Sequence, residues 1–214
     1  EILINVTPSE VRAALLENGI LQEVHVERAS RRGVIRNIYK GMVMRVLPGM
    51  QAAFVDIGLQ RTAFLHVSDI VRQQNGDSDS DELPGIRDLV REGEDVLVQV
   101  VKDPLGNKGA RLTTNISIPS RFLVLLPDSD VVGISTRIED EAERARLKEL
   151  VRTLRDDSQR QGYIVRTNAE GVNDFALAAD MVYLRKVWQA ISERAATAEP
   201  RSCIFEDLVG MLRW

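Results

Sequence analysis

The alternation of side chains between residues 33 and 67 constrains this chain more than any other feature of its sequence. Three short runs place every second side chain on the same side, and a proline-glycine pair at 48–49 and a loop at 57–61 separate them. Period-two runs divided by turn residues are typical of antiparallel strands. The stretch therefore predicts a β-meander in which Phe54 and Phe64 lie on the same face of neighbouring strands.

Two aromatic rings on an exposed β face can stack unpaired bases, because every base has a π-face. The alternative is that one or both phenylalanines fill a core. Arg36, Lys40 and Arg45 could extend a phosphate track beside the rings, since they belong to a basic cluster that begins at residue 28. The formal net charge of −4 argues weakly against a nucleic-acid partner, but a local basic face is what phosphate needs. The alternative for these cations is a solvated rim.

Two further strands are predicted at 92–103 and 108–114, and a short helix at 86–90 is expected to plug one end of the resulting barrel. The polar, acidic insertion at 73–85 predicts a surface loop. Five strands in this order resemble the S-one type of OB-fold, a small RNA-binding barrel, which we expect from about residue 34 to residue 115. In such a barrel Lys108 would contact the RNA backbone beside the two rings.

The segments on either side of the barrel predict a different organisation. A strand at 2–6 and a hairpin at 11–26, turning at Asn18-Gly19, precede the barrel. Residues 116–198 predict an α+β unit, and the whole chain an α+β fold. Its expected elements are strands at 121–127 and 162–167, a short strand or helix lead-in at 133–138, and helices at 139–157 and 174–198, with a returning strand at 203–205.

Several kinds of site are absent from the sequence. Cys203 is the single cysteine, which excludes an internal disulfide and a cysteine zinc cluster and fits a reducing cytoplasm. No run approaches the roughly 20 apolar residues that span a bilayer. Neither HExxH, CxxC nor a P-loop occurs, and no catalytic triad can be assembled. His25, His66 and Asp56 are expected to have structural roles.

A second candidate site is the pair Arg166-Thr167, at the end of the predicted strand 162–167. A guanidinium fork beside a hydroxyl can hold a phosphate through several hydrogen bonds. Taken without any family context, such a pair is more often ordinary surface.

The amino-acid sequences of several segments resemble the ribonuclease E/G family, and most closely its ribonuclease G branch. The segments are NIYKG (37–41), LPGMQAAFVDIG (47–58), VVKDPLGNKGARLTT (100–114) and GYIVRTNAEG (162–171). The resemblance covers nearly the whole chain. It implies an endoribonuclease that cuts single-stranded A/U-rich RNA in ribosomal RNA processing and messenger RNA decay, with a preference for a 5′ monophosphate.

The resemblance also implies an architecture and residue roles. Residues 1–33 would be the first part of an RNase H-like subdomain, 34–115 the S-one barrel, 116–198 the 5′ sensor, and 199–214 the start of the return into the RNase H-like subdomain. The RNA-contacting positions of the barrel are matched by Phe54, Phe64 and Lys108. The positions around the 5′ phosphate are matched by Arg166, Thr167, Val124 and Ser120. Ser120 stands where the ribonuclease E branch has a glycine whose backbone contacts the phosphate.

The family's magnesium-binding acids, and the cysteine pair that shares zinc between protomers, have no counterpart in this sequence. We therefore expect part of a longer protein that holds no cofactor itself, binds single-stranded RNA and does not cleave it. The full-length parent would be a magnesium-dependent, homo-oligomeric, cytoplasmic enzyme without a membrane partner. The alternative is a non-enzymatic S-one module in translation or RNA chaperoning. A small-molecule enzyme is a third reading, for which no site can be assembled.

Overall fold

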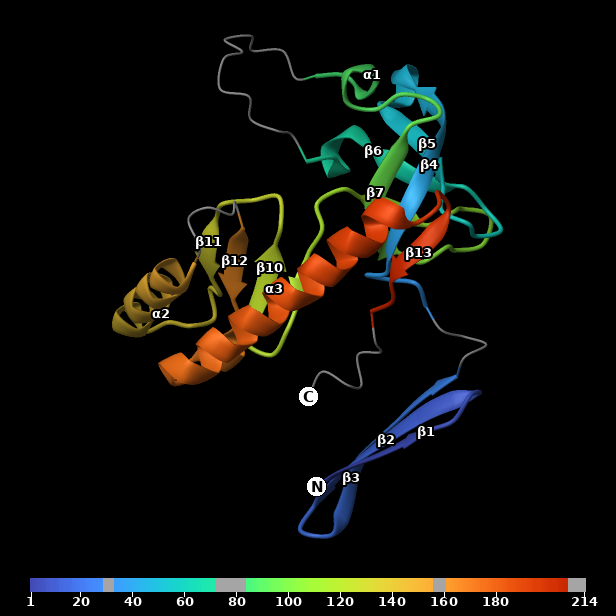
Figure 1. Ribbon diagram of the computed structural model, residues 1–214. Coiled ribbons are helices and arrows are strands. Elements are labelled where there is room, and N and C mark those ends of the chain that lie inside the picture. Colours follow the sequence, from blue (N-terminus) through green and yellow to red (C-terminus); the bar gives the residue numbers. More distant parts are fainter. Residues whose placement is uncertain (29–32, 72–83, 156–160, 208–214) are drawn as a thin grey trace.

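The computed structural model describes residues 1–28, 33–71, 84–155 and 161–207 (Figure 1). Three sheets occur within these residues: an N-terminal sheet, a six-stranded sheet that contains the barrel, and a four-stranded sheet that packs with two helices. Most of the insertion expected at 73–85 and of the basic linker at 28–33 lies outside the described residues. Among the described helices, none combines the length and the hydrophobicity of a membrane-spanning segment.

The barrel is closed because β4 pairs with strands on both of its sides. Its order is β4-β5-β6-β8-β7, and β7 returns to pair with β4. Its strands are β4 (Ile38–Leu47), β5 (Ala52–Asp56), β6 (Ala63–His66), β7 (Asp95–Lys102) and β8 (Arg111–Thr113). All the pairings are antiparallel except β6 with β8. The meander and the five-stranded OB-fold barrel are confirmed.

The predicted alternation decides which side chains fill the barrel. Ala53 and Val55 of β5 and Ala63 and Leu65 of β6 are fully buried, whereas the residues between them face outward. The expected plug is α1 (Ile86–Leu89), whose first residue is fully buried against the same core. The chain therefore builds one apolar core inside the barrel.

A second core lies between the four-stranded sheet and helices α2 and α3. The sheet has the order β11-β12-β10-β9. The elements are β9 (Ile118–Pro119), β10 (Leu123–Leu126), β11 (Val132–Ile134), α2 (Glu141–Leu154), β12 (Gly162–Val165) and α3 (Asp174–Thr197). The predicted α+β unit is confirmed in its main elements, and the short β9 was not predicted. Asp140 and Asn173 cap the two helices, because their side chains accept backbone N–H groups of the first turns.

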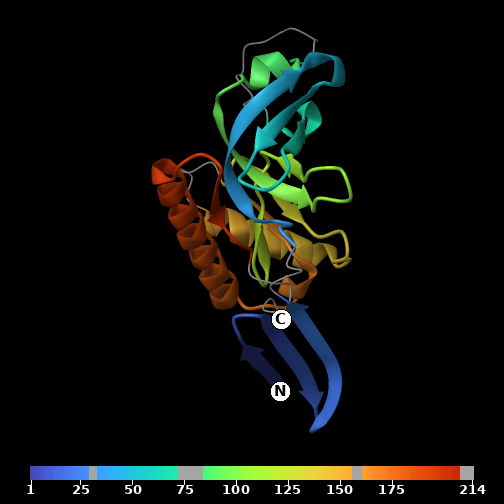
Figure 2. The same ribbon diagram turned by 90° about the vertical axis from the view of Figure 1, so that its right-hand side faces the viewer.

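The chain returns to the barrel after α3. Strand β13 (Ser202–Phe205) pairs with β4, so the strand expected at 203–205 forms and extends the barrel sheet. Gln99 of β7 connects the segment before β4 with the segment before β9. Its buried amide donates to the carbonyls of Arg36 and Ser117 and accepts the Ser117 N–H. Helix α3 reaches from the four-stranded sheet towards the barrel in both views (Figures 1 and 2).

The N-terminal residues form a three-stranded antiparallel sheet. Its strands are β1 (Ile2–Val6), β2 (Glu10–Glu17) and β3 (Ile20–Arg28), and the turn at Asn18-Gly19 has positive φ at both residues, as predicted. The sheet lies apart from the other two in both views (Figures 1 and 2). Many of its large apolar side chains are exposed, among them Ile4 and Val24.

Candidate nucleic-acid interface

Phe54 and Phe64 lie side by side on the outer face of the barrel. They are register partners on β5 and β6, and their ring centroids are 6.1 Å apart with the planes inclined at 66°. His66 continues the row, with its ring 6.4 Å from Phe64 and inclined at 28°. Both phenylalanines are half-buried, so neither fills the barrel core. A β face that carries adjacent aromatic rings has the geometry that base stacking needs.

Arginines flank the aromatic pair on the neighbouring strands. Arg45 of β4 is the register partner of Phe54, and Arg111 of β8 is the partner of Phe64. Arg111 donates two hydrogen bonds to Asp69, at 2.9 and 3.2 Å, and this contact raises the pKa of its guanidinium. Arg45 is exposed. The row of side chains across the sheet thus has an arginine on each side of the two phenylalanines. This arrangement suits a single-stranded nucleic acid, whose bases can stack on the rings while its phosphates contact the arginines.

Lys108 lies in a turn that packs against the beginning of β6. The turn is closed by two backbone hydrogen bonds between Leu105 and Lys108, and the Lys108 side chain is exposed. A Cβ atom on the next residue, Gly109, would lie 2.0 Å from the carbonyl oxygen of Thr62. Only glycine allows this approach, which places the Lys108 turn beside the strand that carries Phe64.

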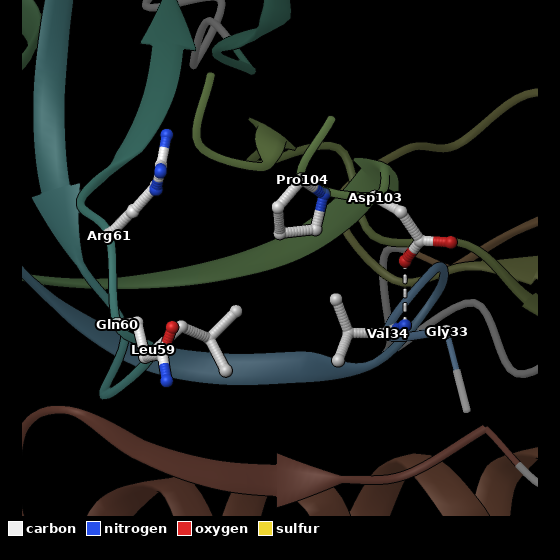
Figure 3. Close-up of a pocket in the computed structure, with 7 residues that line it drawn as sticks. All are labelled: Gly33, Val34, Leu59, Gln60, Arg61, Asp103 and Pro104. Carbon is white, nitrogen blue, oxygen red and sulfur yellow. Dashed lines mark hydrogen bonds between the residues drawn. The ribbon is translucent and has the colours of Figure 1, made fainter. Parts of the chain in front are cut away.

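A cavity of about 440 Å³ lies between the loop before β6 and the end of β7. Figure 3 shows that Val34, Leu59 and Pro104 face this hollow, with Arg61 at one side and Asp103 at the other. Asp103 is fixed in place, since its carboxylate accepts the N–H groups of Val34 and Ile35 at 2.6 and 3.1 Å. The Asp103 side of the cavity is therefore held in place by backbone hydrogen bonds.

The other predicted cations lie elsewhere. Lys40 donates to the Ala198 carbonyl at 2.9 Å and lies 3.9 Å from the Asp95 carboxylate, at the junction with the end of α3. Arg36 has positive φ, and its guanidinium lies 4.0 Å from the Asp207 carboxylate. The structure therefore brings Arg45 to the aromatic row but engages Lys40 and Arg36 at the junction with the C-terminal segment.

The residues expected to be structural have structural contacts. Asp56 accepts the Gly58 N–H at 3.0 Å and pairs with Arg201 at 3.1 Å. His66 accepts the Ser68 N–H at 3.2 Å, at the start of a short helical turn. His25 lies 3.1 Å from the Glu23 carboxylate.

Arg166 and Thr167 directly follow strand β12 of the second sheet. The Arg166 guanidinium donates to the carbonyl oxygen of Ser120, and its backbone N–H donates to the Phe122 carbonyl at 2.8 Å. The Thr167 hydroxyl lies 3.1 Å from the hydroxyl of Ser135. The structure thus gathers a guanidinium and two hydroxyl groups from two segments, 166–167 and the loop at Ser135, a donor set that can hold a phosphate.

Val124 and Ser120 occupy the neighbouring strands. Val124 is the register partner of Ile164, which is 38% exposed, and strand alternation places both on the face opposite the buried Leu123 and Leu125. The backbone N–H of Ser120 donates to the Leu123 carbonyl at 2.8 Å. That N–H therefore already has an acceptor within the protein, and the group that Ser120 presents to Arg166 is its carbonyl.

Sequence reasoning missed several residues of these surfaces. Ser135 and Arg111 have no distinctive spacing, and the cavity beside Arg61 depends on two loops meeting. Asp180 could have been found from the sequence, because it is an acidic residue within the apolar stripe of α3, three residues after the buried Leu177. Within the described residues, no three His, Cys, Asp or Glu side chains lie where they could hold a metal ion.

The fold and these surfaces define an α+β protein built around an S-one type OB-fold barrel. The family model "Ribonuclease E/G family" matches residues 117–214. The chain is 52% identical over 212 residues to Ribonuclease G of Escherichia coli (strain K12), which covers 97% of this chain and 43% of that protein. It therefore belongs to the ribonuclease E/G family.

Two other relatives agree with this assignment. Ribonuclease G of Haemophilus influenzae (strain ATCC 51907 / DSM 11121 / KW20 / Rd) is 51% identical over 209 residues, or 96% of this chain and 42% of that protein. Ribonuclease E of Escherichia coli (strain K12) is 39% identical over 202 residues, or 93% of this chain and 19% of that protein. The chain thus spans less than half the length of these curated relatives.

Proposed function

We propose that this chain is the RNA-recognition part of a ribonuclease E/G type endoribonuclease. In this proposal a single strand of RNA crosses the outer face of the barrel, and its 5′ monophosphate is bound beside Arg166. The observation that carries the proposal is the placement of Phe54 and Phe64 as register partners on the barrel exterior, between Arg45 and Arg111.

The barrel supplies affinity without strong sequence preference. Bases stack on the two rings, Lys108 and Arg45 contact phosphates, and the cavity beside Arg61 lies at the end of this path. The second sheet supplies recognition of the RNA end. A 5′ monophosphate carries more negative charge than a 5′ hydroxyl, so it gains charge-assisted hydrogen bonds from Arg166 and from the Thr167 hydroxyl. Val124 offers an apolar surface beside the terminal nucleotide.

The remaining assignments belong to the same proposal. Residues 1–33 and 199–214 contribute to an RNase H-like subdomain, 34–115 form the S-one domain, and 116–198 form the 5′ sensor. The enzyme acts on single-stranded A/U-rich RNA in ribosomal RNA processing and messenger RNA decay, as a cytoplasmic homo-oligomer. In this proposal, magnesium chemistry and inter-subunit zinc belong to parts of the full-length family members outside the segment that this chain matches.

The experiment that tests this proposal uses two short A/U-rich RNAs that differ only in a 5′ monophosphate or a 5′ hydroxyl, at one salt concentration. Wild-type protein is expected to bind the phosphorylated RNA more tightly. Arg166→Ala should remove that preference and leave the hydroxyl RNA unaffected. Arg152→Ala, which removes the same charge from an exposed position on α2, is the matched control. Equal binding of both RNAs by the wild type would refute the sensor assignment.

A further inference from the structure

Asp180 of α3 holds the turn that faces Arg166. One carboxylate oxygen, Oδ2, accepts three hydrogen bonds from this turn: the Ser120 hydroxyl at 2.5 Å, the Phe122 N–H at 3.0 Å and the Leu123 N–H at 3.0 Å. Hydrogen bonds to an ionised acceptor are shorter and stronger than neutral ones. A long helix thus fixes, through one side chain, three donors of the turn between β9 and β10.

The same turn is bonded to Arg166 by its carbonyl groups. The Ser120 carbonyl accepts from the Arg166 guanidinium, and the Phe122 carbonyl accepts the Arg166 backbone N–H at 2.8 Å. Phe122 is therefore held at both polar groups of its backbone, by Asp180 on one side and by Arg166 on the other. A displacement of the turn would move the acceptor that orients the guanidinium.

The conformation of the 120–123 turn depends on Asp180, because two of its backbone N–H groups have the Asp180 carboxylate as their acceptor. Its own closure is the Ser120 N–H donating to the Leu123 carbonyl at 2.8 Å, with the Ser120 hydroxyl 3.0 Å from the same carbonyl oxygen. The N–H groups of Phe122 and Leu123 point to the carboxylate, and without it they would lose their acceptor in a half-buried place. The turn would then have to shift, or admit water, to satisfy them.

We propose that Asp180 is a positioning residue for recognition of the RNA 5′ end. It fixes the 120–123 turn, and the Ser120 carbonyl in turn sets the direction of the Arg166 guanidinium before RNA arrives. Preorganisation of this kind increases affinity because the bound arrangement needs no further ordering. This inference rests on the proposed function, in which Arg166 binds the 5′ monophosphate.

The first test measures, in the intact protein, the ratio of dissociation constants for 5′-hydroxyl and 5′-monophosphate RNA. Asp180→Ala is expected to lower the wild-type ratio by about tenfold, the equivalent of one charge-assisted hydrogen bond. Affinity for the 5′-hydroxyl RNA should stay unchanged, which a general loss of folding would not produce. Glu193→Ala removes a carboxylate from an exposed position on the same helix and should keep the wild-type ratio.

Asp180→Asn provides a milder variant if the alanine variant does not fold. Its amide oxygen can still accept the two backbone N–H groups, so the ratio should fall between those of the wild type and Arg166→Ala. Ser120→Gly removes only the hydroxyl donor and keeps the carbonyl that Arg166 contacts, so most of the ratio should remain. A folded Asp180→Ala or Asp180→Asn protein with the full wild-type ratio would overturn the inference.

The second test needs no RNA and separates this inference from the proposed function. The guanidinium Nε–H signal of Arg166 in nitrogen-15 NMR spectra reports whether the side chain is held in one orientation. We expect a distinct signal in the wild type and an averaged one in Asp180→Ala. If the wild type shows no 5′ preference but the Arg166 signal still changes in Asp180→Ala, the positioning role of Asp180 is supported and the sensor function is refuted. An unchanged signal would refute the positioning role itself.

Discussion

Truncation of Phe54 to alanine should weaken RNA binding while leaving the barrel folded. The ring lies on the outer face of β5, and the residues before and after it, Ala53 and Val55, form the core. The substitution therefore removes surface that a base would cover and leaves the buried side chains in place. Its register partner Phe64 remains on β6.

The expected magnitude follows from the contacts of the ring. Stacking of one base on an aromatic side chain contributes about 1–3 kcal/mol, which corresponds to a loss of about 5- to 160-fold in affinity. The edge contact with Phe64, at 6.1 Å between centroids, contributes about 0.5–1.5 kcal/mol and affects folding stability. Because the two rings are in contact, the double variant Phe54→Ala/Phe64→Ala should lose less affinity than the two single losses added together.

The assay is fluorescence anisotropy with a short unstructured A/U-rich RNA at fixed salt, together with thermal unfolding of each variant. Phe175→Ala is the matched control, since that ring is 83% exposed on α3 and lies outside the barrel sheet. It should leave RNA affinity unchanged. The reasoning is refuted if Phe54→Ala and Phe64→Ala both bind RNA as tightly as the Phe175→Ala control.

Three further predictions concern stability. Gly109→Ala should lower the free energy of unfolding by about 1–3 kcal/mol and also weaken RNA binding, because its Cβ would lie 2.0 Å from the Thr62 carbonyl oxygen and displace the Lys108 turn. Gln99→Ala should destabilise the protein by about 1–3 kcal/mol in urea unfolding, since it leaves buried backbone groups without partners. Hydrogen bonds from Arg146, and then from a backbone N–H, lower the pKa of the Glu143 carboxyl from 4.5 to about 2. Its contribution to stability is therefore complete above pH 4.5 and should be lost as the pH falls towards 2.

Each of these predictions has a control within the chain. Gly49→Ala places a Cβ in open space and should change little. Gln189→Ala removes an exposed amide on α3 that bonds only a neighbouring side chain, so its cost should be small. Glu143→Gln should flatten the part of the stability curve below pH 4.5, and an unchanged slope there would contradict the assigned role.

The barrel could be predicted because its alternation is local. Successive side chains of β5 and β6 divide between core and exterior, so the sequence by itself placed Phe54 and Phe64 on one face. The helices were predicted for a similar reason, from their apolar stripes, whereas the capping residues Asp140 and Asn173 were identified only in the structure. Element ends differed by a few residues, as they do wherever the last turn or pair of a segment is weakly defined.

The surface sites depend on contacts between distant segments, which a periodic pattern does not encode. Lys40 was grouped with Arg45 by proximity in the chain, but α3 ends beside Lys40 and supplies its acceptor. Ser135 and Asp180 lie 32 and 60 residues from the groups they contact, Thr167 and Ser120. The two-residue strand β9 was not predicted from the sequence, because it is too short to show an alternation of side chains.

Amide hydrogen exchange with and without RNA would locate both proposed contact surfaces, the barrel face and the Arg166 region, in one experiment. With 5′-monophosphate RNA, we expect slower exchange at β5 and β6 and also at residues 120–124 and 166–167. With the matched 5′-hydroxyl RNA, protection should remain on the barrel and disappear from the second group. Protection that is the same for both RNAs, or that avoids β5 and β6 altogether, would contradict the account.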